Sequence, residues 1–179
     1  MSETPEQRAR HQIDAMLAAS GCAVQAKERI NLSACRGMAV CELSFSTGEP
    51  DYTLFADGKA IGTAEAKPES FPLSGVEEES AKYATGFPGG LPAWRKPLPF
   101  CCESTSSETR FTNRLDPDPR SRNIFTFHRP ETLLAYLVVE VERRLSVSEE
   151  LESVVSANLL RAVRLRQSIL QKAFSGESM

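Results

Sequence analysis

The sequence predicts an α/β domain followed by a long helix, and three features support this. Short apolar segments bounded by turn residues follow one another between residues 37 and 67, as in an antiparallel sheet. Stretches with helical spacing of apolar residues lie before and after these segments. From Glu131 to Phe174 the chain has neither proline nor glycine, which favours a continuous helical region.

Composition is that of a folded globular protein. Hydrophobic residues make up 41% and charged residues 25% of the 179 residues, so a core can form. No apolar run reaches the length of a membrane span, and the polar N-terminus lacks the apolar centre of a signal peptide. We therefore expect a cytoplasmic protein without membrane contact. An odd number of cysteines, five, without a signal peptide argues against a disulfide framework, and the lack of a C-x-x-C pair argues against structural zinc.

The first predicted helix runs between Thr4, a suitable N-cap, and Gly21, a suitable terminator. Ile13, Met16 and Leu17 form its buried stripe. Residues 37–47 predict the first strand.

A hairpin follows that strand. Residues 51–56 read as a second strand and 59–67 as a third, with Asp57-Gly58 as the two-residue turn between them. Residues 37–67 therefore predict a three-stranded antiparallel meander. Downstream, the sequence predicts a helix at 76–85, a loop at 86–97, strands at 98–105 and 107–113, a loop at 116–122, and a helix from Pro130.

The last helix carries a seam typical of coiled coils. Its members recur at alternating spacings of four and three residues: Leu151, Val155, Asn158, Ala162, Leu165 and Ile169. Ser146 with Glu149 forms a possible capping box, so the helix could also restart near 146. We assign residues 1–136 to the α/β domain and 137–179 to a coiled-coil-like helical appendage.

The meander carries a charged trio. Glu65 and Lys67 are two residues apart, so they point to the same face of their strand, and hairpin pairing returns them beside Asp51. Two carboxylates and the Ala66 carbonyl suit Mg²⁺ or Mn²⁺. Lys67 could orient an attacking water and stabilise negative charge during phosphodiester hydrolysis. The pattern alone also fits an acidic strand with surface charges.

Residues 5–136 resemble the N-terminal PD-(D/E)xK nuclease domain of type I restriction enzyme R subunits. The resemblance rests on PDYTLFADGKAIGTAEAKPES and on four further collinear segments: NLSACRGMAV, LSGVEEESAKYATGFP, LPFCCESTSSETRFTN and DPDPRSRNIFTFHRPETL. It implies a restriction-endonuclease-like core, with a mixed central sheet flanked by helices, and makes Asp51, Glu65 and Lys67 the catalytic positions. The family's Gln-x-x-x-Tyr motif matches Glu79 and Tyr83 here, where an ionised glutamate cannot donate the hydrogen bond of a glutamine amide.

Residues 139–174 resemble a different protein, the C-terminal spacer helix of type I S (specificity) subunits, through the run LLRAVRLRQSILQKAF. This resemblance implies contact with type I methyltransferase or specificity subunits, and the seam also allows a homodimer. The chain contains no G-x-x-x-x-G-K-[ST] sequence, so we expect no ATP site in it.

A cationic stretch is the predicted DNA contact. It contains Arg110, Arg114, Arg120, Arg122 and Arg129. Arginines here can contact phosphates, or can pair with Asp116 and Asp118 in a solvated loop.

Two functions follow from these patterns. The first is a magnesium-dependent endodeoxyribonuclease with little sequence specificity, from a type I restriction-modification context. The alternative is a silent or partner-dependent assembly module that docks through its C-terminal helix. Paired helices could also join two nuclease sites in one dimer.

Overall fold

The computed structural model describes residues 5–69, 73, 82–105 and 107–176. The chain divides into two compact units, Met1–Leu137 and Val138–Met179. In the described part, no helix combines the length and apolar character that crossing a bilayer requires. The first unit contains the whole sheet, and the second consists of the greater part of one helix.

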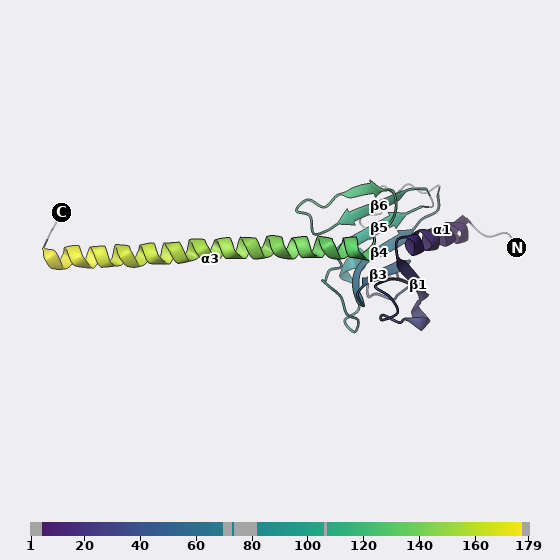
Figure 1. Ribbon diagram of the computed structural model, residues 1–179, viewed down its shortest axis with the longest axis horizontal. Helices are drawn as coiled ribbons and strands as arrows, with labels where there is room; N and C mark the ends of the chain where they lie inside the picture. Colours follow the sequence, from purple (N-terminus) through teal and green to yellow (C-terminus); the bar gives the residue numbers. More distant parts are fainter. Residues whose placement is uncertain (1–4, 70–72, 74–81, 106, 177–179) are drawn as a thin grey trace. The chain divides into compact units, whose positions relative to one another are not determined.

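A seven-stranded mixed sheet forms the first unit, with its strands side by side in chain order (Figure 1). The strands are β1 (Cys22–Ala26), β2 (Gly37–Cys41), β3 (Tyr52–Ala56), β4 (Lys59–Ala66), β5 (Phe100–Ser104), β6 (Thr109–Asn113) and β7 (Ser121–Ile124). The pairs β1–β2 and β4–β5 are parallel, and the other four neighbouring pairs are antiparallel. The predicted α/β fold with a mixed sheet is confirmed.

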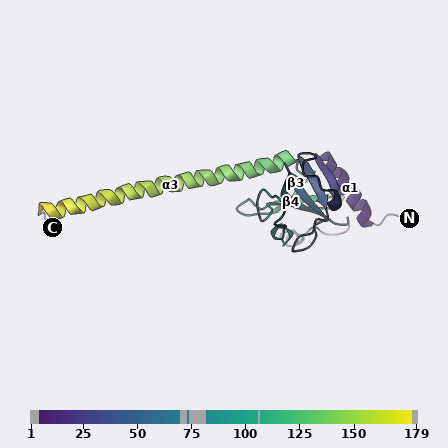
Figure 2. The same cartoon turned by 90° about the horizontal axis from the view of Figure 1, so that it is seen from below.

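The meander of β2, β3 and β4 is confirmed, and so is its hairpin (Figure 2). Asp57 and Gly58 both have positive φ, 48° and 75°, as a two-residue hairpin turn of the favoured twist requires. The pairing shifts by one residue between Leu54 and Phe55, and beyond this shift Tyr52 lies opposite Ala64. That register sets which residues meet at the far end of the hairpin.

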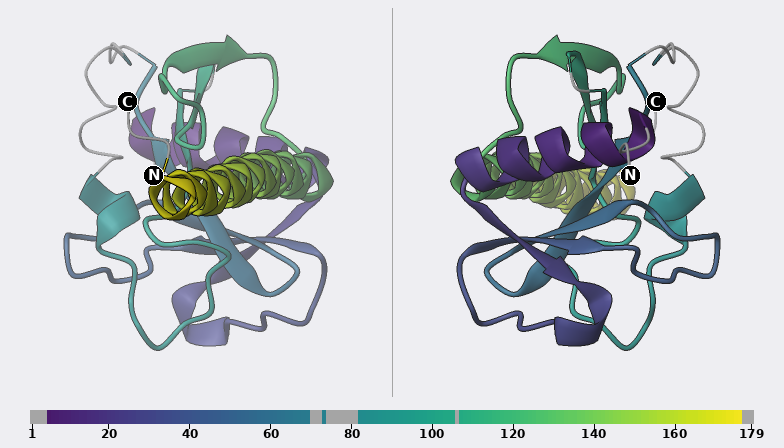
Figure 3. Two further views of the ribbon diagram at one scale, coloured as in Figure 1. Left: turned by 90° about the vertical axis from the view of Figure 1, so that its left-hand side faces the viewer. Right: turned by 90° about the vertical axis from the view of Figure 1, so that its right-hand side faces the viewer.

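One face of the sheet is covered by α1 (Pro5–Ala19), which crosses the strands in Figure 3, and by the first turns of α3 (Pro130–Ser175). Ile13 and Leu17 of α1 are completely buried there, with Leu133 of α3 beside them in the same core. His128 packs edge-on against Phe111, with ring centroids 4.5 Å apart. His128 is therefore a packing residue.

Among the described residues, the opposite face is covered by loops and by the helical residues 82–85. Phe87 packs edge-on against Phe45 and lies near Phe55. The Trp94 indole N–H donates to the Ala56 carbonyl oxygen at 2.8 Å, and the Lys59 ammonium lies 4.4 Å from its ring centroid. These contacts fasten the Gly/Pro-rich loop to the end of the β3–β4 hairpin.

Some predicted boundaries were wrong. The strand predicted for 37–47 ends at Cys41, because Glu42 takes a left-handed φ of 50° that breaks the pleat. β1 was missed, as was the short 3₁₀ turn after it (Lys27–Arg29), and β7 was missed because its polar sequence occupies a half-exposed sheet edge. Of the helix predicted at 76–85, residues 82–85 are helical and 76–81 lie outside the described residues.

Helix α3 is continuous across residue 146. The Ser146 hydroxyl donates to the Glu142 carbonyl oxygen at 3.1 Å, one turn earlier, so Ser146 caps no new helix. Within the second unit, Leu151, Val155, Leu165 and Ile169 are 56–62% exposed. The predicted seam is thus a line of exposed apolar side chains.

Candidate active site

The β3–β4 hairpin brings the two predicted carboxylates together. Because Tyr52 pairs with Ala64, Asp51 lies opposite Glu65 at the open end of the hairpin. The Asp51 amide N–H points to Glu65 Oε1 at 3.4 Å, and the Ala66 amide N–H donates to Asp51 Oδ2 at 2.8 Å. Each carboxylate is therefore anchored on the backbone of the other strand.

Burial raises the electrostatic energy of the two negative charges on Asp51 and Glu65. Glu65 is only 4% exposed, and the Asp51 side chain is 17% exposed. Two carboxylates on facing residues of one hairpin, with little water to screen them, favour a neighbouring cation. The hairpin therefore builds a site that attracts positive charge.

Lys67 supplies one cation. Its ammonium lies 3.6 Å from Glu65 Oε2, as expected for residues two apart on one strand face. Its amide N–H donates to the Ser104 carbonyl oxygen at 2.8 Å, which continues the β4–β5 pairing past Ala66. Lys67 is thus held at the backbone while its side chain follows the same face as Glu65.

Arg10 supplies another cation, and sequence reasoning missed it. From α1, its Nη2 donates to Asp51 Oδ1 and its Nη1 to Glu42 Oε1, each at 2.6 Å. The hydrogen bond and charge of Arg10 lower the pKa of Glu42, and its bond to Glu42 with the nearby Asp51 raises the pKa of Arg10. Arg10 lies three residues before Ile13 and seven before Leu17, which puts it on the same side of the helix as these core residues. A charged residue on that side was the sequence feature that could have pointed to Arg10.

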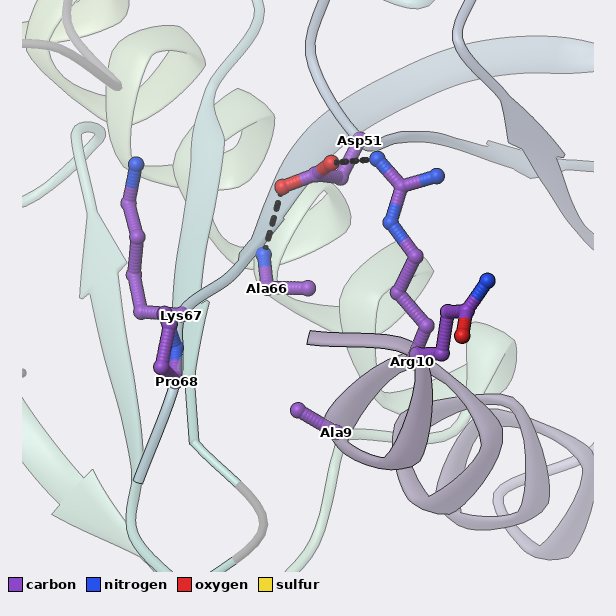
Figure 4. A pocket seen from close by; sticks show the side chains of 7 residues that line it. Ala9, Arg10, Asp51, Ala66, Lys67 and Pro68 are labelled. Carbon is purple, nitrogen blue, oxygen red and sulfur yellow. Dashed lines mark hydrogen bonds and ion pairs between the residues drawn. The ribbon is translucent and has the colours of Figure 1, made fainter. Parts of the chain in front are cut away.

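Arg10, Asp51 and Lys67 border one pocket of about 440 Å³ (Figure 4). Figure 4 shows Arg10 extended from α1 to Asp51, with Ala66 on the other side of the carboxylate and Lys67 beyond it. The lining residues are Gln7, Ala9, Arg10, Asp51, Ala66, Lys67 and Pro68. A cavity with two cations and an exposed carboxylate edge is suited to an anionic ligand together with a metal ion.

A further acidic residue, Glu103 on β5, lies beside Glu65. The two are partners in the parallel β4–β5 register, so their side chains share one sheet face. Glu103 is completely buried, and burial together with the Glu103 charge raises the pKa of the neighbouring Cys101 thiol to about 11. The sequence placed Glu103 in the strand predicted for 98–105. Its pairing with Glu65 could not be predicted, because it depends on the long-range crossover between β4 and β5.

The donor set fits a hard divalent cation. Asp51, Glu65 and the Ala66 carbonyl offer oxygen ligands, which Mg²⁺ prefers while it keeps several waters. Among the described residues, no three His, Cys, Asp or Glu side chains gather into a metal cluster. A metal here would therefore rely on two carboxylates, a carbonyl and water.

The auxiliary motif is seen only in part. The Tyr83 ring packs over Gly48, so closely that a methyl group on this glycine would lie 2.7 Å from the ring. Tyr83 therefore borders the turn that leads to Asp51. Glu79 lies outside the described residues. The role predicted for this pair stays a prediction.

Three of the five predicted DNA-contacting arginines form ion pairs with nearby acids. Arg120 contacts Asp118 at 2.6 Å, Arg122 contacts Asp116 at 3.5 Å, and Arg110 contacts Glu108 at 2.9 Å. The pairs with Asp116 and Asp118 are those that the sequence allowed as the alternative. Arg114 and Arg129 complete the set, Arg114 lying near the Cys101 thiol and Arg129 exposed.

Comparison with solved structures supports the fold. The chain is similar to a fragment structure of a protein described as the HsdR subunit of a type I restriction enzyme from Vibrio vulnificus YJ016, with a TM-score of 0.57 and 17% identity. The match covers 78% of this chain and 26% of that one, so this chain spans about a quarter of its length. No family model and no curated protein matches the sequence. At this identity the likeness shows a shared α/β fold, that of a type I restriction R-subunit fragment.

Proposed function

We propose that this chain is a metal-dependent endodeoxyribonuclease of the PD-(D/E)xK class, acting in a type I restriction-modification context. The observation that carries the proposal is the meeting of Asp51, Glu65 and Lys67 at the open end of one hairpin, beside a pocket. The R-subunit-like fold supports the same interpretation. Carboxylates and a lysine suit a metal ion and a phosphate rather than a base edge, which favours little sequence specificity.

Each residue has a chemical task in this proposal. Asp51, Glu65 and the Ala66 carbonyl would hold Mg²⁺ or Mn²⁺. When bound, such an ion polarises the scissile phosphate and favours ionisation of a ligated water. Lys67 would orient the attacking water and stabilise charge on the phosphate, and Glu65, 3.6 Å away, would hold the ammonium in place.

Nicking of supercoiled plasmid tests the proposal. We expect the protein with Mg²⁺ or Mn²⁺ to convert the plasmid to open circles, and EDTA to stop the reaction. Asp51→Ala should abolish nicking, whereas Asp57→Asn, which removes a carboxylate at the closed end of the same hairpin and keeps a residue that tolerates positive φ, should retain it. Equal nicking by wild type and Asp51→Ala would rule out this site as the source of the activity.

A second candidate function is assembly, favoured by the exposed apolar line on α3. Side chains such as Leu165 and Ile169, each about 60% exposed, form a continuous surface that typically marks an interaction site. Docking on methyltransferase or specificity subunits, or pairing of two copies, would cover it. The nuclease site could then work only within the assembly.

Light scattering and pull-down with those subunits test this second candidate. Leu165→Glu should weaken self-association or subunit binding, whereas Gln167→Glu places the same charge off the seam and should have little effect. A wild-type protein that is monomeric and retains none of the subunits would count against assembly through α3.

A further inference from the structure

We infer that Arg10 competes with the divalent metal for Asp51, and that Glu42 retains Arg10 when the metal displaces it. This inference rests on the proposed function, because it concerns the metal site assigned there. It adds a positioning residue from α1, which neither the hairpin motif nor the family resemblance points to.

Both carboxylate oxygens of Asp51 already accept hydrogen bonds. Its Oδ2 accepts the Ala66 N–H at 2.8 Å, and its Oδ1 accepts Arg10 Nη2 at 2.6 Å. Oδ1 is therefore the oxygen that faces a cation, and that cation is the guanidinium. A metal ion bound to the same oxygen would repel the Arg10 guanidinium, since two like charges a few Å apart in a partly buried site raise each other's energy.

The Arg10 guanidinium bridges two carboxylates. Arg10 uses two different nitrogens for two carboxylates, Nη2 for Asp51 and Nη1 for Glu42. Because the planar fork is rigid, loss of the Asp51 bond leaves the Glu42 bond available. Glu42 lies at the end of β2, in the left-handed conformation that ended the strand early, and its side chain is about half exposed.

Arg10 lies at the open side of the pocket, where its side chain has room to move. It lines the same cavity as Asp51 and Lys67, and its side chain is 45% exposed. It can therefore move without unpacking the core formed by Ile13 and Leu17. Held by Glu42, it would keep its positive charge at the rim, where a phosphodiester would approach.

Mn²⁺ binding to the full chain, followed by electron paramagnetic resonance of the unbound ion, tests the competition without any cleavage. Arg10→Gln should tighten Mn²⁺ binding on the order of 2- to 5-fold, the range expected from loss of a half-exposed ion pair. Arg8→Gln removes the same charge from an exposed position of the same helix and should change binding much less, since salt screens distant charges. Unchanged or weaker binding by Arg10→Gln would overturn the inference.

The role of Glu42 is tested in two backgrounds. Glu42→Gln should weaken Mn²⁺ binding when Arg10 is present, because Arg10 then has Asp51 as its remaining carboxylate. The effect should largely vanish in the Arg10→Gln background. A similar effect in both backgrounds would show that Glu42 acts only as a distant charge, and would overturn its retaining role.

Mn²⁺ binding also distinguishes failure of this inference from failure of the proposed function. Asp51→Asn should abolish Mn²⁺ binding; binding that survives this change would place the metal elsewhere and refute the metal site itself. Binding that depends on Asp51 but is indifferent to Arg10 would refute only the competition. Trp94 fluorescence and thermal melting of each variant would verify that the first unit remains folded.

Discussion

Replacing Asp51 by alanine should lower the free energy of unfolding of the first unit by about 1–2 kcal/mol. The change removes the acceptor of the Ala66 N–H, a bond to a charged group worth roughly 1.5–3 kcal/mol where water is excluded. It also removes the pair with Arg10, which at 45% exposure contributes about 1 kcal/mol or less. Relief of repulsion with Glu65, and access of water to the freed groups, offset part of this loss.

Asp51→Asn makes the matched comparison. Its side-chain oxygen can still accept from Ala66, so it should cost about 1 kcal/mol less than Asp51→Ala. Urea unfolding followed by the fluorescence of Trp94, the single tryptophan, reports on the hairpin directly, because its indole donates to Ala56. A loss above about 4 kcal/mol for Asp51→Ala, or equal losses for both variants, would refute this account of the site. Within the predicted range both variants stay folded, so a loss of nicking can be assigned to chemistry.

Three further predictions concern the core, the pH response and the arginines. Leu17→Ala, in a completely buried position, should cost about 2–5 kcal/mol in urea unfolding, and Arg8→Ala on the same helix less than about 0.5 kcal/mol; similar losses would contradict the α1 packing. Burial lowers the pKa of His128 below 6.5, so stability should fall as the pH drops through 6.5 toward the lower folded-state pKa, and His128→Phe should flatten this slope between about pH 7.5 and 5.5. The double variant Arg120→Gln/Arg122→Gln should weaken DNA binding. The slope of log binding constant against log salt concentration should also become shallower by roughly 0.9 for each phosphate that is no longer neutralised. An unchanged slope would show that these arginines pair with Asp118 and Asp116 and do not contact DNA.

Local signals explain which parts of the fold could be predicted. Asp57-Gly58 encodes its own turn, and the two-residue periodicity of the flanking strands then sets Asp51, Glu65 and Lys67 on one face. The strands predicted at 98–105 and 107–113 are confirmed, since β5 and β6 lie within these ranges. The trio could be predicted because it is confined to one hairpin.

Long-range contacts explain what was missed. The contact of Arg10 with Asp51 depends on how α1 packs across the sheet, and the neighbouring position of Glu103 and Glu65 depends on the parallel β4–β5 crossover. Neither is encoded by spacing along the chain. β7 was missed because its sequence, SRNI, holds a single apolar residue, and its place at the sheet edge leaves Arg122 and Asn123 exposed.

The most direct test of the central claim is a double-mutant comparison of plasmid nicking rates in Mg²⁺. If Asp51 and Lys67 belong to one metal-dependent site, Asp51→Asn and Lys67→Met should each lower the rate by at least about 100-fold, and the double variant should be little slower than either single one. Lys59→Met, on the same strand beside Trp94, should cut like wild type. Wild-type rates in the two site variants, or losses that simply multiply in the double variant, would contradict a single site built from these residues.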